Sequence, residues 1–129
     1  MKLTPVLLVE SIEDALPFWV DRLGWQKIVE VPDGDRLGFV IIVREGLELM
    51  IQTFASARND EPRFVRENGG HRTSLFLEVD DWDDALKRLE GYPITMPERE
   101  TFYGMREIGV FAPGEHVVVF GKHIDAPKS

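Results

Sequence analysis

Glu48 is the residue whose chemical type and surroundings point most directly to a function. It lies in Leu47-Glu48-Leu49-Met50-Ile51-Gln52, where every odd-numbered residue is aliphatic. Because successive strand residues point to opposite faces, this alternation predicts a strand with Glu48, Met50 and Gln52 on the less apolar face. A carboxylate there can bind a cation or act as a general base. Glu48 is therefore the one candidate for a catalytic residue.

The same alternation in other segments places further side chains on the face of Glu48. In the segment from Thr73 to Val79 it selects Ser74 and Phe76. We expect these side chains to line one ligand cleft, whose full set is Thr4, Val6, Glu48, Met50, Gln52, Ser74, Phe76, Arg106, Val118 and Phe120.

Glu48 also has interpretations that need no ligand. It can be solvated in an open cleft, or paired with Arg36 or Arg106. These two arginines occur at matching places in the two halves of the sequence. They can form an anion clamp, or they can be strand-edge charges paired with Glu45 and Glu107.

Composition excludes several classes of protein. The 129 residues are 43% hydrophobic, which suits one packed domain and excludes disorder of the whole chain. The sequence has no Cys, so thiol and disulfide chemistry are excluded. The net charge of -8 and the lack of Lys/Arg clusters disfavour nucleic-acid binding. No apolar stretch is long enough for a membrane span or a signal peptide, so we expect a cytoplasmic protein.

Helical and strand periodicity together predict the elements that position these residues. Helical spacing begins after Ser11 and stops at Gly24, with Pro17 expected to kink the helix or shift its start. A second helix is expected at residues 81–89, and a short surface helix at 59–68. The expected strands cover residues 3–9, 25–31, 36–43, 47–54, 73–79, part of 94–102, 104–111 and 115–121.

The second half of the sequence repeats the first at an offset of 70 residues without gaps. The strongest match aligns the segment from Val9 to Leu16 with the segment from Val79 to Leu86. The order of elements repeats too, which predicts an α+β fold of two tandem βαβββ modules forming a curved mixed sheet around a cleft. We assign module one to residues 1–56, a connecting segment to 57–71, module two to 72–123 and a tail to 124–129, within a single domain of residues 1–129.

Several motifs in this order resemble the vicinal oxygen chelate superfamily, which includes glyoxalase I, bleomycin and fosfomycin resistance proteins and extradiol dioxygenases. The resemblance spans Leu3 to about His123. It rests on the segment from Val9 to Trp19 with Leu23-Gly24-Trp25, on Leu47-Glu48-Leu49-Met50, on Leu77-Glu78-Val79-Asp80-Asp81, and on the segment from Tyr103 to Ile108 followed by Ala112-Pro113-Gly114-Glu115. It implies the glyoxalase/bleomycin resistance fold.

Metal-dependent members of this superfamily share two His and two Glu ligands. The matching positions here are Thr4, Glu48, Ser74 and Val118, or Val119 if the last turn is counted differently. Only Glu48 could bind a divalent ion, and one carboxylate with two hydroxyls does not make a specific transition-metal site. The sequence therefore predicts no metal and no cofactor.

The loss of these ligands points toward the metal-free branch that the bleomycin resistance proteins represent. That resemblance implies a homodimer that binds a small organic ligand, such as a cationic aromatic drug, and so confers antibiotic resistance without chemistry. The alternative is an enzyme, either a metal-dependent lyase, isomerase or dioxygenase-like protein with an atypical ligand set, or a metal-free one with Glu48 as general base. A metal-dependent glyoxalase I is disfavoured. A third interpretation, an interaction module, predicts a filled cleft.

Overall fold

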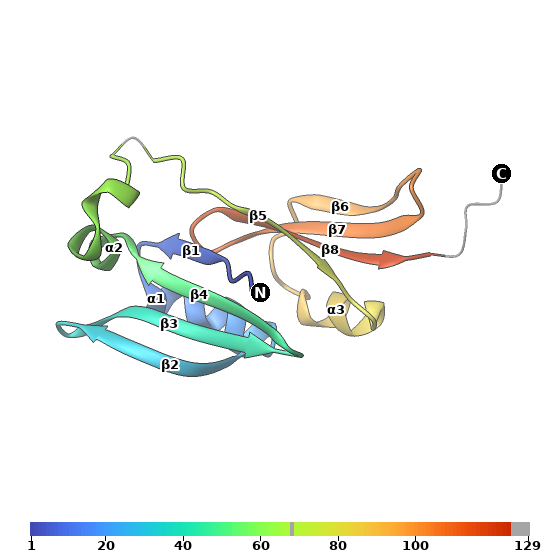
Figure 1. The fold of residues 1–129 in the computed structure, drawn as a ribbon. Coiled ribbons are helices and arrows are strands. Elements are labelled where there is room, and N and C mark those ends of the chain that lie inside the picture. The colour runs from blue at the N-terminus through green and yellow to red at the C-terminus, as the bar shows by residue number, and fades with distance from the viewer. Residues whose placement is uncertain (68, 125–129) are drawn as a thin grey trace. The chain divides into compact units, whose positions relative to one another are not determined.

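The computed structural model describes residues 1–67 and 69–124, and the chain divides after Arg72 into two compact units. Unit 1 is Met1–Arg72, and unit 2 begins at Thr73. Each unit contains a four-stranded mixed sheet and a helix that packs on one face of it (Figure 1). The α+β class and the two tandem modules are therefore confirmed.

Unit 1 is built on a sheet whose strand order is β1-β4-β3-β2. β1 runs parallel to β4, and the other neighbours are antiparallel. The helix α1 covers one face, where Leu7, Ile42 and Ile51 are buried. The elements are β1 (Val6–Val9), α1 (Ile12–Leu16), η1 (Pro17–Arg22), β2 (Gln26–Asp33), β3 (Arg36–Arg44), β4 (Leu47–Thr53), α2 (Phe54–Asp60) and η2 (Pro62–Phe64).

The helix after Ser11 starts where the sequence predicts. The Ser11 hydroxyl accepts a hydrogen bond from the Asp14 N–H at 3.2 Å, as an N-cap does. At Pro17 the helix does not restart but widens into the π-helical turn η1. There the Leu23 N–H reaches back five residues to the Phe18 carbonyl, at 3.0 Å.

The predicted surface helix at residues 59–68 is wrong, and its end, Asn68, lies outside the described residues. The helix in this region is α2, which starts directly after β4. The Thr53 hydroxyl caps it by accepting the Ser56 N–H at 3.1 Å. Pro62 keeps Glu61 in an extended conformation, so the α-helix ends there and a short 3-10 turn follows.

Unit 2 has the corresponding strand order β5-β8-β7-β6, with β5 parallel to β8. The helix α3 packs on one face of this sheet, and Trp82, Ala85 and Leu89 are buried there. The elements are β5 (Ser74–Glu78), α3 (Trp82–Arg88), β6 (Met96–Glu100), β7 (Met105–Ala112) and β8 (His116–His123). In the described part of the chain, no helix has the length and apolar character needed to cross a membrane.

The offset of 70 residues does not hold through the second hairpin. Val6 pairs with Met50, whereas Ser74 pairs with Val117, so the counterpart of Glu48 is Val117, one residue earlier than the offset requires. The hairpin turns differ in length: two residues separate Arg44 from Leu47 in unit 1, but three separate Ala112 from His116 in unit 2. Counting from these pairs, Arg106 corresponds to Gly38 and not to Arg36, so the expected equivalence of the two arginines is wrong.

Candidate functional site

Each sheet has one face that its helix does not cover, and we call this the helix-free face. In unit 1, Leu49 and Ile51 of β4 point into the core under α1, while Glu48, Met50 and Gln52 point to the helix-free face. The register brings apolar neighbours to this face from the adjacent strands: Val6 and Leu8 from β1, and Phe39, Ile41 and Val43 from β3. Glu48 thus lies on a largely apolar surface.

Glu48 is held by two residues that precede β1. The Lys2 ammonium lies 2.8 Å from Glu48 Oε2, and the Thr4 hydroxyl donates a hydrogen bond to the same oxygen at 3.3 Å. The Glu48 side chain is 17% exposed and the Lys2 side chain 68%. The expected pairing of Glu48 with Arg36 or Arg106 is wrong, because Lys2 is the cation within reach.

These contacts determine the protonation of Glu48. The hydrogen bond from Lys2 lowers the pKa of the Glu48 carboxyl below its ordinary value of 4.5. Partial burial opposes this shift, while the charge of Lys2 and the Thr4 hydroxyl add to it. Glu48 is consequently a carboxylate at neutral pH, and a weaker base than a free glutamate.

In unit 2, two of the residues expected to line a cleft are core residues instead. Ser74 and Phe76 point to the helix-free face, and their partners on β8 are Val117 and Val119. Val118 and Phe120 point to the opposite face, under α3, where Val118 is 0% exposed. The expectation for Val118 and Phe120 is wrong because the three-residue turn shifts the register of β8 by one residue, which exchanges its faces.

Arg106 is also on the other face of unit 2. It pairs with Lys122 across the β7–β8 ladder, on the same side as Phe120 and α3. Its guanidinium reaches Glu100 at 3.1 Å and Glu98 at 3.7 Å. It lines a hollow of about 510 Å³ beside the start of α3. Arg106 therefore does not share a face with Ser74 and Phe76, and its expected partner Glu107 lies elsewhere.

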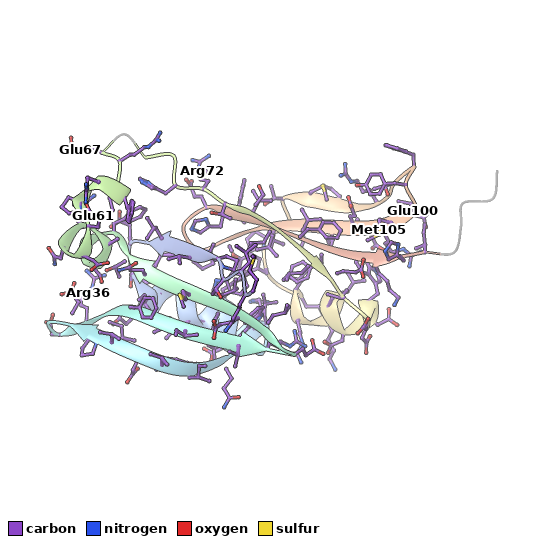
Figure 2. All side chains as sticks on the ribbon, viewed as in Figure 1. Arg36, Glu61, Glu67, Arg72, Glu100 and Met105 are labelled. Carbon is purple, nitrogen blue, oxygen red and sulfur yellow. The ribbon has the colours of Figure 1, made fainter. Side chains whose placement is uncertain are left out.

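The sequence reasoning missed a polar cluster on the helix-free face of unit 2. Glu107 of β7 is buried and accepts two hydrogen bonds from Arg99 of β6, at 2.9 and 3.1 Å. The Tyr103 hydroxyl donates to its other oxygen at 2.8 Å. The cluster lies near the end of the β6–β7 hairpin, where Figure 2 labels Glu100 and Met105. Alternation in β7 could have revealed it, since Ile108 and Val110 are core residues and Glu107 must face the other way.

The donor set does not fit a divalent metal ion. Glu48 has Lys2 and Thr4 as partners, and the fourth position that the resemblance assigns is occupied by Val117, whose side chain has no donor atom. Residues 1–67 and 69–124 contain no group of three or more His, Asp or Glu that could hold a metal ion.

The three histidines have other partners. His116 Nδ1 accepts the Thr73 N–H, and His71 Nε2 accepts the Arg66 N–H. His123 lies 2.9 Å from Glu78.

Comparison with known proteins gives a family match over most of the chain. The family model described as Glyoxalase/Bleomycin resistance protein/Dioxygenase superfamily matches residues 3–120. A search of curated proteins gives no significant match.

Solved structures with the same fold are numerous. A glyoxalase/bleomycin resistance protein/dioxygenase from Nocardioides is 19% identical with a TM-score of 0.78, covering 99% of this chain and 87% of its own. TioX from Micromonospora sp. ML1 is 20% identical with a TM-score of 0.76, covering 96% and 99%. A lactoylglutathione lyase from Agrobacterium tumefaciens is 17% identical with a TM-score of 0.72, covering 95% and 92%. At these identities the likeness concerns the fold.

Proposed function

Because the chain belongs to the Glyoxalase/Bleomycin resistance protein/Dioxygenase superfamily, we propose that it binds a small organic molecule, such as a cationic aromatic compound, without a resident metal ion. The proposed site is the helix-free face of unit 1 around Glu48. The observation that carries the proposal is the ion pair between Glu48 and Lys2, which matches this carboxylate with an ammonium group. A carboxylate in this state is suited to binding an organic cation.

The surfaces around the site support an apolar ligand body. Apolar side chains of β1, β3 and β4 surround Glu48 on the helix-free face of unit 1, and Val6 is among the exposed ones. Considered by itself, the helix-free face of unit 2 exposes Phe76 and Phe111. Aromatic faces attract cations, and the net charge of -8 favours their approach.

Catalysis by Glu48 as a general base has less support. Proton abstraction near neutral pH favours a carboxyl group with a raised pKa, and the Lys2 contact lowers the pKa of Glu48. The proposal is therefore binding and sequestration. If the ligand is a drug, sequestration would confer antibiotic resistance.

Thermal-shift and calorimetric screening tests this function. The panel contains cationic aromatic compounds, uncharged aromatic compounds and divalent metal ions. Stabilisation by organic ligands in the absence of metal is expected, at about 2.7 kcal/mol when the ligand exceeds Kd about 100-fold. Stabilisation by divalent ions alone would contradict the proposal.

Elemental analysis and turnover assays separate binding from catalysis. We expect no stoichiometric metal in the purified protein, and unchanged ligand after incubation. Turnover that is lost in Glu48→Gln would replace the proposed function with an enzymatic one.

We also propose that the protein is a cytoplasmic homodimer. The support is the family resemblance together with the apolar residues that β2 exposes, Ile28, Val29 and Val31. Sedimentation at micromolar concentration tests the oligomeric state, and a monomer would contradict it. Fractionation of the source cells tests the location.

A further inference from the structure

The ion pair between Lys2 and Glu48 joins two groups with very different surroundings. The Glu48 side chain is 17% exposed, because it sits on a paired strand among apolar neighbours. The Lys2 side chain is 68% exposed and belongs to residues 1–5, which precede β1. The carboxylate is therefore built into the sheet, while the ammonium reaches it from the solvent side.

Glu48 is also the only negative charge on its surface. Among the described positions that strand pairing assigns to the helix-free face of β1, β3 and β4, Glu48 is the only carboxylate. Val43 lies opposite it on β3, and Met50 follows it on the same face of β4. A single charge on an apolar surface orients a ligand that has an apolar body and one complementary charge.

We infer that Glu48 is the anchor for a cationic nitrogen of the ligand, and that Lys2 occupies this anchor in the free protein until the ligand displaces it. The inference rests on the proposed function and specifies the ligand class as organic cations with an apolar body. The Thr4 hydroxyl, which donates to the same carboxylate oxygen, can remain in place during the exchange.

The exchange is physically reasonable because it preserves charge balance. The Glu48 carboxylate has a cationic partner before and after ligand binding, so no unpaired charge is left on the apolar face. Lys2 returns its ammonium to water and regains side-chain freedom, and an exposed ion pair is weak. The occupied state lowers the apparent affinity by the fraction of molecules in which Lys2 blocks the anchor.

Two dyes of similar shape and different charge test the inference. Proflavine is a cationic aromatic compound at neutral pH, and acridine is its uncharged counterpart. Dissociation constants are measured by fluorescence and calorimetry for the wild type, Lys2→Ala, Glu48→Gln and the double variant. Lys27→Ala is the matched control, because Lys27 forms an exposed ion pair with Glu30 at 2.6 Å on β2.

The expected results depend on both charge and variant. Lys2→Ala strengthens proflavine binding about two- to fivefold, the effect of removing an exposed competitor. Glu48→Gln weakens it about tenfold or more. The double variant shows no gain over Glu48→Gln. Acridine binding and the Lys27→Ala control change little.

Two other outcomes separate the inference from the proposed function. Proflavine binding that is unaffected by Lys2→Ala and Glu48→Gln would overturn the inference and leave the proposed function standing. Failure of both dyes and of every organic compound in the panel to bind the wild type would overturn the proposed function, and the inference with it.

Discussion

The ring of Phe76 lies over Gly121, its near neighbour on the adjacent strand β8. A Cβ atom at position 121 would come within 2.4 Å of the ring Cζ and 3.1 Å of Met105 Cε. Phe76 is 52% exposed, so the absent side chain at Gly121 is what lets this aromatic ring lie against the sheet on the helix-free face of unit 2. Both of the close atoms are the far ends of side chains that can turn aside.

Gly121→Ala is expected to move the Phe76 ring and to lower the free energy of unfolding by only about 1 kcal/mol, because flexible side chains absorb the added methyl group. Gly38→Ala is the contrasting variant. Its Cβ would lie 2.8 Å from Asp33 Cβ and 3.1 Å from Ser56 Cβ, atoms that move only with the backbone. We expect a loss of about 1–3 kcal/mol there. Urea unfolding compares them, and a larger loss for Gly121→Ala would contradict this account.

Tyr103→Phe is expected to lower the free energy of unfolding by about 0.5–1.5 kcal/mol, because it removes the hydroxyl that donates to the buried Glu107 carboxylate. Phe102→Leu is the control, since the neighbouring Phe102 is 94% exposed and should change stability by less than about 0.5 kcal/mol. Urea unfolding at neutral pH measures both. Equal effects would show that the hydroxyl contributes nothing.

His116→Ala is expected to destabilise the protein by about 2–4 kcal/mol. His116 is 0% exposed, and its Nδ1 accepts the Thr73 N–H at 3.0 Å, so the variant leaves both a cavity and an unpaired donor. His123→Ala is the control, because the ion pair of His123 with Glu78 is exposed and worth about 0–1 kcal/mol. Thermal unfolding of the two variants should differ clearly, and similar melting temperatures would contradict the buried role.

Glu13→Gln is expected to reduce the dependence of stability on acidic pH. The Leu37 N–H donates to the Glu13 carboxylate at 2.7 Å, which lowers the pKa of Glu13 below 4.5 and ties α1 to β3. A carboxyl group whose pKa is lower in the folded state stabilises the fold above its unfolded pKa. That contribution disappears as the pH falls through its folded pKa. The wild type should therefore exceed Glu13→Gln in stability at neutral pH and lose this advantage below about pH 4.

Urea unfolding of the two proteins at a series of pH values measures this difference. Asp35→Asn serves as a control at an exposed turn position in the same unit. A difference between wild type and Glu13→Gln that stays constant from neutral to acidic pH would contradict the predicted role of the carboxylate.

Lys2→Met is expected to raise the pKa of Glu48 toward 4.5, because the hydrogen bond from Lys2 is the largest cause of its lowering. Titration of the Glu48 side-chain carbonyl by NMR measures the change, and Lys27→Met provides the comparison. The direction matters for the proposed site, since a raised pKa leaves less carboxylate at mildly acidic pH. A Glu48 titration that is identical in wild type and Lys2→Met would contradict the contact.

Local sequence was sufficient for most of the elements. Alternation in Leu47 to Gln52 correctly assigned the two faces of β4, and Ser11 marked the start of α1. These signals work because they depend on residues within a few positions of one another. The helix near residue 59 was misplaced for the same kind of reason, since the cap at Thr53 was read as the end of a strand.

The partners of the candidate residues were less accessible. Lys2 as the cation on Glu48, and Arg99 and Tyr103 as the donors to Glu107, depend on where loops and preceding segments bring flexible side chains. Charge and spacing in the sequence allowed several pairings, including those with Arg36 and Arg106.

The sequence by itself determined the α+β class, the tandem modules and the isolation of Glu48 as a carboxylate on an apolar surface. Only the tertiary structure decided which residues of β8 share a face with Ser74 and Phe76. The difference has a physical cause: facing within one strand follows from backbone geometry, but the pairing of β5 with β8 spans more than forty residues and depends on the length of one hairpin turn. One additional turn residue was enough to place Val117 beside Ser74 and to bury Val118 in the core.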